Sequence, residues 1–136
     1  MKIFICCSKY LYDKIPEIEE KLEKAGHSII LPNSFEEPLK EEKMKKVGRE
    51  EHIKWKSNML RLQDTKVKES DALLILNFEK NGQSNYIGGA TFLEIFKAWE
   101  LGKKIYLINP IPESMIKDEL TAMNPIILNG DLTKIK

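Results

Sequence analysis

Five apolar residues in a row, Ala72-Leu73-Leu74-Ile75-Leu76, make the most hydrophobic segment of the chain. A run so short and so apolar is typical of a strand buried on both faces, as the central strands of a parallel sheet are. Four further segments are predicted as strands: Lys2–Cys7, His27–Leu31, Lys104–Ile108 and Pro125–Leu128. We therefore expect a five-stranded sheet with helices covering both faces.

Amphipathic segments separate these strands. Ile15, Ile18 and Leu22 fall on one face of a helix predicted over Tyr12–Ala25, and Gly26 is its expected C-cap. Further helices are predicted over Glu50–Glu69, Gly88–Gly102 and Glu113–Met123. Strands that alternate with helices indicate an α/β fold with parallel strands and right-handed crossovers. The pattern predicts one domain over residues 1–136, built on a doubly wound sheet in the order 2-1-3-4-5.

The segment Glu36–Lys56 differs from the rest because charged residues crowd it. One interpretation is a solvated helix held by ion pairs between residues four apart. Two functional interpretations stay open beside it, namely a mobile flap over a pocket and a surface that docks a protein partner. His52 belongs to no metal-ligand motif, so we expect a surface histidine.

The charge balance and the N-terminus exclude several protein classes. The chain has 22 Lys and Arg residues against 21 Asp and Glu residues, which gives no support to nucleic acid or an anionic membrane as its main partner. No apolar stretch reaches the roughly 20 residues of a membrane span. Asp13 follows the first apolar run too soon for a secretory signal. Cys6 and Cys7 are adjacent, so they form neither a disulfide framework nor a CxxC motif. We expect a cytoplasmic protein that needs no metal or redox cofactor.

Ligands of doubly wound sheets bind outside the carboxyl ends of the strands, here between the first and third strands. The candidate substrate-binding residues at that edge are Cys7, Ser8, Asn77, Asn85, Gly88 and Gly89. No GxGxxG or GxxxxGK[ST] motif is present, which disfavours NAD and ATP. Paired glycines at a helix start let a ligand approach the backbone, and the free N–H groups there favour an anionic or hydroxyl-rich group.

Glu94 has two interpretations. It lies in the second turn of the helix that opens at Gly88, where a solvent-facing glutamate is favoured by the helix dipole. A carboxylate near the crevice could instead attack a sugar carbon, as in retaining glycoside chemistry. Asp71 precedes the central strand, and this position alone places it at the amino end, away from the crevice.

Several segments together resemble a known family. These are Phe4–Ser8, Ser70–Asn77, Gly88–Ile95, Ala98 and Leu101–Ile105. They are similar to the nucleoside 2-deoxyribosyltransferase family, which includes deoxynucleoside 5′-monophosphate N-glycosidases, and the similarity extends from Lys2 to about Leu128. The resemblance implies a flavodoxin-like fold and a homodimer or higher homo-oligomer in which a neighbour completes each active site. The implied partner is a small nucleoside or nucleotide.

The same resemblance implies a mechanism. Glu94 matches the catalytic glutamate, which attacks the anomeric carbon of a 2-deoxyribosyl group and forms a glycosyl-enzyme. A second base then accepts the sugar in a transferase, or water accepts it in a hydrolase. Asp71 matches an aspartate that helps to organise the base site, and Ser8 matches a loop serine of the monophosphate-hydrolysing branch.

Three positions differ from the usual family residues. Phe4 stands where a tyrosine often bonds the nucleophile, Gly88 where an aspartate or serine is common, and Phe96 where a glycine is common. Asn85 is the nearest polar candidate to replace the missing side chain at Gly88. These differences leave an alternative function, a catalytically inactive module of the same fold that binds and senses a nucleotide.

Overall fold

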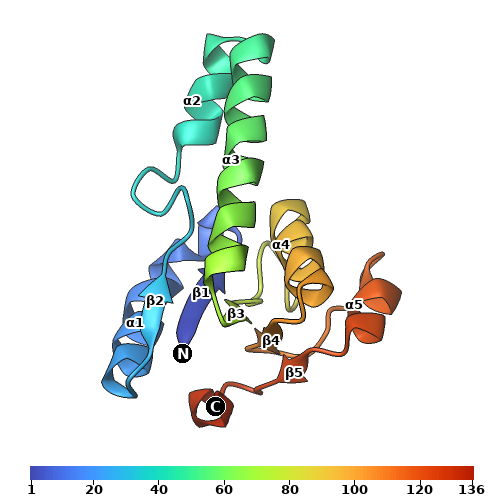
Figure 1. The fold of residues 1–136 in the computed structure, drawn as a ribbon. Helices are drawn as coiled ribbons and strands as arrows, with labels where there is room; N and C mark the ends of the chain where they lie inside the picture. The colour runs from blue at the N-terminus through green and yellow to red at the C-terminus, as the bar shows by residue number, and fades with distance from the viewer.

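The computed structural model describes residues 1–136, and its five strands form one parallel sheet in the order β2-β1-β3-β4-β5 (Figure 1). The strands are β1 (Lys2–Cys6), β2 (Ser28–Ile30), β3 (Ala72–Ile75), β4 (Lys104–Leu107) and β5 (Ile126–Ile127). The α-helices are α1 (Ile15–Lys24), α2 (Lys40–Val47), α3 (Arg49–Glu69), α4 (Gly89–Glu100) and α5 (Lys117–Met123). Two short 3₁₀ helices, η1 (Lys9–Lys14) and η2 (Leu132–Lys134), complete the fold. The predicted flavodoxin-like α/β fold and its strand order are confirmed.

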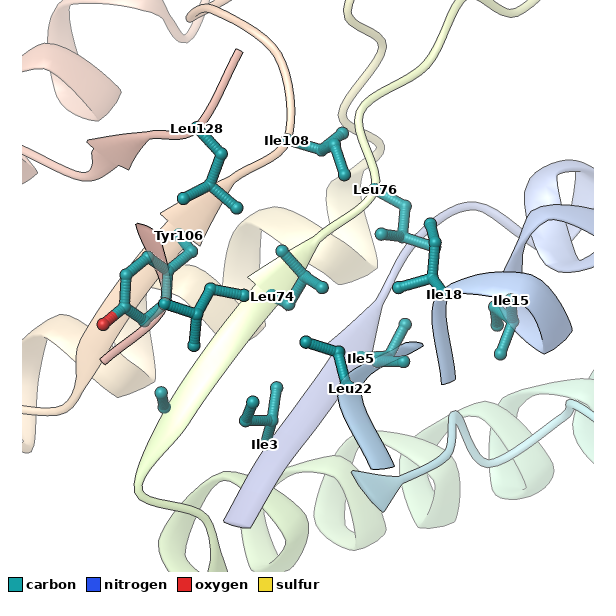
Figure 2. Close-up of a cluster of buried hydrophobic side chains, with 12 residues drawn as sticks. Ile3, Ile5, Ile15, Ile18, Leu22, Leu74, Leu76, Tyr106, Ile108 and Leu128 are labelled. Carbon is teal, nitrogen blue, oxygen red and sulfur yellow. The ribbon is translucent and has the colours of Figure 1, made fainter. Parts of the chain in front are cut away.

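The central strands send alternate side chains to opposite faces of the sheet, and each face has its own apolar core. Ile3, Ile5, Leu74 and Leu76 pack on one face against α1, whose Ile15, Ile18 and Leu22 lie over them (Figure 2). Phe4, Cys6, Leu73 and Ile75 face the other way, toward Val67 of α3, Ile95 of α4 and Leu120 of α5. Burial of each such side chain stabilises the fold by about 1.5–3 kcal/mol. Burial on both faces is why the strands read as unbroken apolar runs.

The first helical segment is shorter than predicted. Residues Lys9–Lys14 form the 3₁₀ helix η1, and α1 starts only at Ile15. Pro16 occupies its first turn, where a missing N–H group removes no helical hydrogen bond. Gly26 follows the helix with a φ of +95°, a conformation that glycine adopts without a steric penalty. The early turn keeps η1 beside the carboxyl end of β1.

The charged segment forms α2 and the first half of α3, which pack against each other as a helical hairpin. Figure 1 shows this hairpin extending past the end of the sheet. The helical spacing of Ile53, Lys56 (by its stem), Leu60 and Val67 predicts one buried stripe along α3, and this prediction is wrong for the first half of the helix. Val67 is fully buried against the sheet, whereas Ile53 is 53% exposed because only α2 lies beside that part of α3. No helix, α3 included, is both long and apolar enough to cross a membrane.

Candidate active site

A cavity of about 260 Å³ lies at the carboxyl end of β1, between the sheet edge and the base of the α2–α3 hairpin. The β1–α1 connection contributes Cys7, Ser8, Lys9, Tyr10 and Tyr12. The segment after β2 contributes Pro32, Asn33, Ser34 and Pro38, and the hairpin contributes Glu41, Lys56, Met59 and Gln63. The β3–α4 loop and the start of α4 contribute Lys80, Tyr86, Gly88, Gly89, Ala90, Thr91 and Glu94. Four separate parts of the chain thus converge on one small space.

Glu94 is the buried carboxyl group of this cavity, with only 7% of the residue exposed. Burial raises the pKa of Glu94 from an ordinary 4.5 to about 8, because a desolvated carboxylate is less stable than the neutral acid. A hydrogen bond that the Cys6 thiol can donate, and the charges of Lys66 and Lys56, oppose part of that rise. With such a pKa, roughly one-tenth of the groups are ionised at pH 7. Glu94 is therefore not the solvent-facing glutamate of the simpler interpretation.

The hydroxyl and thiol groups around Glu94 are neutral at physiological pH. Burial raises the pKa of the Cys7 thiol to about 12 and that of the Cys6 thiol well above its ordinary value, with the nearby Glu94 charge acting in the same direction. Burial also raises the pKa of the Tyr12 phenol. A thiol must be deprotonated to act as a nucleophile, so neither cysteine competes with Glu94 for that role.

Three lysines line the cavity, and they differ in their partners. The Lys9 ammonium pairs with Glu42 and lies 3.9 Å from Glu41, while the Lys56 ammonium lies 3.3 Å from Glu41. Lys80 has no carboxylate partner. Its ammonium instead lies 4.3 Å from the centroid of the Tyr10 ring and 4.4 Å from that of Tyr86. Such cation–π contacts hold Lys80 in place and leave its charge free for an anionic ligand.

Glu41 ties the helical hairpin to the rest of the cavity wall. Besides Lys9 and Lys56, its carboxylate contacts His52 at 3.0 Å. Partial burial raises the pKa of Glu41, but the hydrogen bond with His52 and the charges of Lys56 and Lys9 lower it by more. His52, predicted to be a surface residue, is half-buried by this contact and by stacking on Trp55. The charged segment is thus a cavity wall held by ion pairs rather than only a solvated helix.

Five of the predicted site residues line this cavity together: Cys7, Ser8, Gly88, Gly89 and Glu94. Gly88 and Gly89 form the start of α4, as predicted, and the backbone there faces the cavity directly. Sequence reasoning missed Glu41, Lys56 and Lys80 as wall residues. The position of Lys80 in the loop after the central strand was a usable signal, but nothing in the sequence places Glu41 or Lys56 over the sheet edge.

Asn85 lies outside this cavity. It lines a second, wider hollow of about 910 Å³ on the other side of Gly88 and Gly89, which the segment Ile111–Ile116 closes. A left-handed backbone with a φ of +56° at Asn85 turns the loop in that direction. No buried titratable side chain lines the second hollow, so it offers no group for acid–base or nucleophilic chemistry.

Asp71 and Asn77 have structural roles instead of the predicted contacts with substrate. Asp71 lies at the amino end of β3, where its carboxylate accepts the Lys2 N–H at 2.7 Å, and this bond holds it at the edge opposite the cavity. Asn77 is fully buried; its amide donates to the carbonyls of Asn109 and Pro110 and accepts the Asn109 N–H. These bonds engage both N–H groups and the carbonyl oxygen of the Asn77 amide, and neither Asn77 nor Asp71 lines the cavity, contrary to the prediction.

No cluster of three or more His, Cys, Asp or Glu side chains is arranged to hold a metal ion. The cavity brings together a buried carboxyl group, hydroxyl groups, the backbone N–H groups at the start of α4 and a cation without a carboxylate partner. No protein-family model matches the chain, and no curated protein matches it either.

Proposed function

We propose that this chain is an enzyme that cleaves or transfers the N-glycosidic bond of a deoxynucleoside or its 5′-monophosphate, with Glu94 as the nucleophile. The observation that carries the proposal is a buried carboxyl group in a small cavity that also contains Ser8 and the glycine-opened start of α4. The resemblance of these segments to the nucleoside 2-deoxyribosyltransferase family supplies the reaction class. The volume is near the lower end for small-molecule sites, which suits one small ligand rather than a polymer.

Glu94 reacts as the ionised carboxylate, which is the nucleophilic form of the group. A Glu94 oxygen forms a bond to C1′ of the sugar as the C1′–N bond breaks, and the bonding electrons leave with the base, which takes up a proton from water. Water, or the nitrogen of a second base, then attacks C1′, loses a proton to the solvent and releases the Glu94 carboxylate. Glycosyl transfer and hydrolysis differ only in that acceptor.

Lys80 favours a substrate that carries a phosphate. Its ammonium is the unpaired cation of the cavity wall, and the N–H groups at the start of α4 line the same space. A cation and a helix N-terminus both attract an anionic group. A 5′-monophosphate is the anionic group of the proposed substrates.

Product analysis by chromatography tests the proposal. The protein is incubated with each deoxynucleoside and each 5′-monophosphate, with and without a second free base. Base release without an acceptor indicates a hydrolase, and a new nucleoside formed only with the acceptor indicates a transferase. Glu94→Ala should abolish turnover while the circular dichroism spectrum stays that of the folded protein. Full activity in that variant would exclude Glu94 as the nucleophile.

A nucleotide sensor without catalysis is the second candidate, and Phe4 is the observation that favours it. The Phe4 ring is completely buried and has no hydroxyl to orient Glu94, while Gly88 has no side chain to do so. A poorly oriented nucleophile loses much of its reactivity. Micromolar binding of a nucleotide in calorimetry, with no product after prolonged incubation, would favour the sensor. We also propose a homo-oligomer, which sedimentation analysis of the purified protein tests directly.

A further inference from the structure

Lys66 is a partly buried cation of α3 that has no carboxylate within ion-pair distance. Its ammonium donates a hydrogen bond of 2.6 Å to the carbonyl of Leu31, at the end of β2. The same ammonium lies 6.0 Å from the centroid of the Phe4 ring. The side chain is therefore turned inward, into the layer between α3 and β1.

The packing of α3 on α4 brings Lys66 close to Glu94. The two helices lie side by side (Figure 1), and the Gln63 amide of α3 donates to the Ala90 carbonyl of α4 at 3.2 Å. Both helices cross over between parallel strands, so they run in the same direction. Lys66 comes one turn after Gln63, and Glu94 comes one turn after Ala90. The two side chains thus occupy corresponding positions on neighbouring helices.

The titratable groups around Glu94 come from three elements, β1, η1 and α3, and from the residue that follows β1. Cys6 and Cys7 belong to β1 and the residue after it, Tyr12 to η1, and Lys56 and Lys66 to α3. The thiols and the phenol are neutral at pH 7, so among these groups the two lysines are the ones that can balance a negative charge on Glu94. Lys56 already pairs with Glu41. Lys66 has no carboxylate partner of this kind, so its charge is available to stabilise ionised Glu94.

Burial and the charge of the other residue have opposite effects on the pKa of Lys66, and likewise on the pKa of Glu94. Burial lowers the pKa of Lys66, and the charge of Glu94 partly restores it. Burial raises the pKa of Glu94, and the charge of Lys66 partly lowers it. Each charged form therefore stabilises the other, as expected for two opposite charges in a poorly solvated layer.

We propose that Lys66 is the positioning residue of the Glu94 nucleophile: its ammonium stabilises the ionised carboxylate from behind and supplies the polar support that Phe4 cannot. This inference rests on the proposed function only in treating Glu94 as the nucleophile. The Leu31 carbonyl and the Phe4 ring hold the ammonium within the protein, and Lys66, unlike Glu94, does not line the cavity. The cavity side of the carboxyl group then stays open to a sugar.

The test measures the titration of Glu94 directly, by NMR of protein labelled with ¹³C at the glutamate carboxyl carbons. The spectrum of Glu94→Gln identifies the Glu94 signal by its disappearance. Lys66→Met should raise the pKa of Glu94 by about one unit, a tenfold change in its ionisation constant, because an opposite charge has been removed. Lys66→Arg should restore the original titration. Lys68→Met is the matched control, since Lys68 lies on the same helix but is exposed and pairs with Asp64.

Lys66→Gln guards against a folding defect, because glutamine removes the charge but can still donate a hydrogen bond. If Lys66→Met and Lys66→Gln titrate Glu94 as Lys68→Met does, the proposal is refuted. With an active enzyme, the pH at which kcat/KM changes should move upward with the Glu94 titration in both uncharged variants and return in Lys66→Arg. A shifted titration in a protein that turns over no substrate would support the Lys66–Glu94 coupling and refute the proposed function. Normal turnover with an unshifted titration would do the opposite.

Discussion

Replacement of Glu94 by glutamine should make the stability of the protein much less sensitive to pH. In the folded chain the pKa of Glu94 is about 8, against about 4.5 for an ordinary glutamate. Between these two values the folded state holds a proton that the unfolded state has lost. By linkage, the free energy of unfolding must fall as the pH rises through this window. Glutamine resembles the neutral acid in shape and cannot ionise.

The magnitude follows from the difference between the two pKa values. That difference is about 3.5, and each unit corresponds to about 1.4 kcal/mol, so the loss approaches 5 kcal/mol above pH 8. At pH 6 the loss is roughly 2 kcal/mol by the same reasoning. A domain with a total stability of about 5–15 kcal/mol would show such a change clearly. Glu94→Gln should match the wild type near pH 4.5 and exceed its stability progressively up to pH 9.

Urea unfolding at five pH values from 5 to 9 measures this difference, followed by circular dichroism. Glu23→Gln is the control, because Glu23 is exposed on α1 and has no ion pair. That variant should follow the wild type at every pH. Parallel loss of stability in the wild type and in Glu94→Gln would show that Glu94 is ionised at little free-energy penalty, and the reasoning about its burial would be wrong.

Three further predictions concern Glu94, Lys80 and Asn77. Because the proposed nucleophile is the Glu94 carboxylate, kcat/KM should rise about tenfold per pH unit below pH 8 and level off above it; a kcat/KM that is constant below pH 8 and falls above it would contradict this role. Lys80→Met should raise KM about tenfold for a 5′-monophosphate and leave KM for the unphosphorylated nucleoside within about twofold, because only the phosphate loses a charge-assisted hydrogen bond. Equal effects on the KM of both substrates in steady-state kinetics would refute the phosphate contact. Asn77→Ala should lower the free energy of unfolding by about 3 kcal/mol, because the buried partners in the Asn109 loop lose their hydrogen bonds. Chemical denaturation checks this last value against the exposed Asn58→Ala, which should unfold like the wild type.

The strands could be predicted from the local sequence because the pattern of apolar residues in each strand reflects how that strand is buried. The run Ala72–Leu76 is apolar on every residue, and the structure buries all of them. The residues at which individual helices begin were less predictable. Nothing in the composition of Lys9–Lys14 distinguishes a 3₁₀ turn from the first turn of α1, since the two differ only in which carbonyl each N–H bonds.

Only some residues of the candidate site could be predicted from the sequence, because others reach or leave the cavity through long-range contacts. Cys7, Ser8, Gly88 and Glu94 follow strands or open a helix at the carboxyl edge, so topology alone brings them together. Asn77 also ends a strand at that edge, but hydrogen bonds to a loop more than thirty residues away turn its side chain from the cavity. Glu41 and Lys56 reach the cavity only because the α2–α3 hairpin folds back over η1.

The amino-acid sequence by itself determined the alternation of strands and helices and the position of Glu94 in the helix that follows the central strand. Each of these depends on periodicity and chain direction, which are local properties. Only the tertiary structure decided that Glu94 is buried, which raises its pKa, and that the Lys66 ammonium is turned into the protein. Desolvation and charge act through space, and the residues that impose them come from β1, η1 and α3.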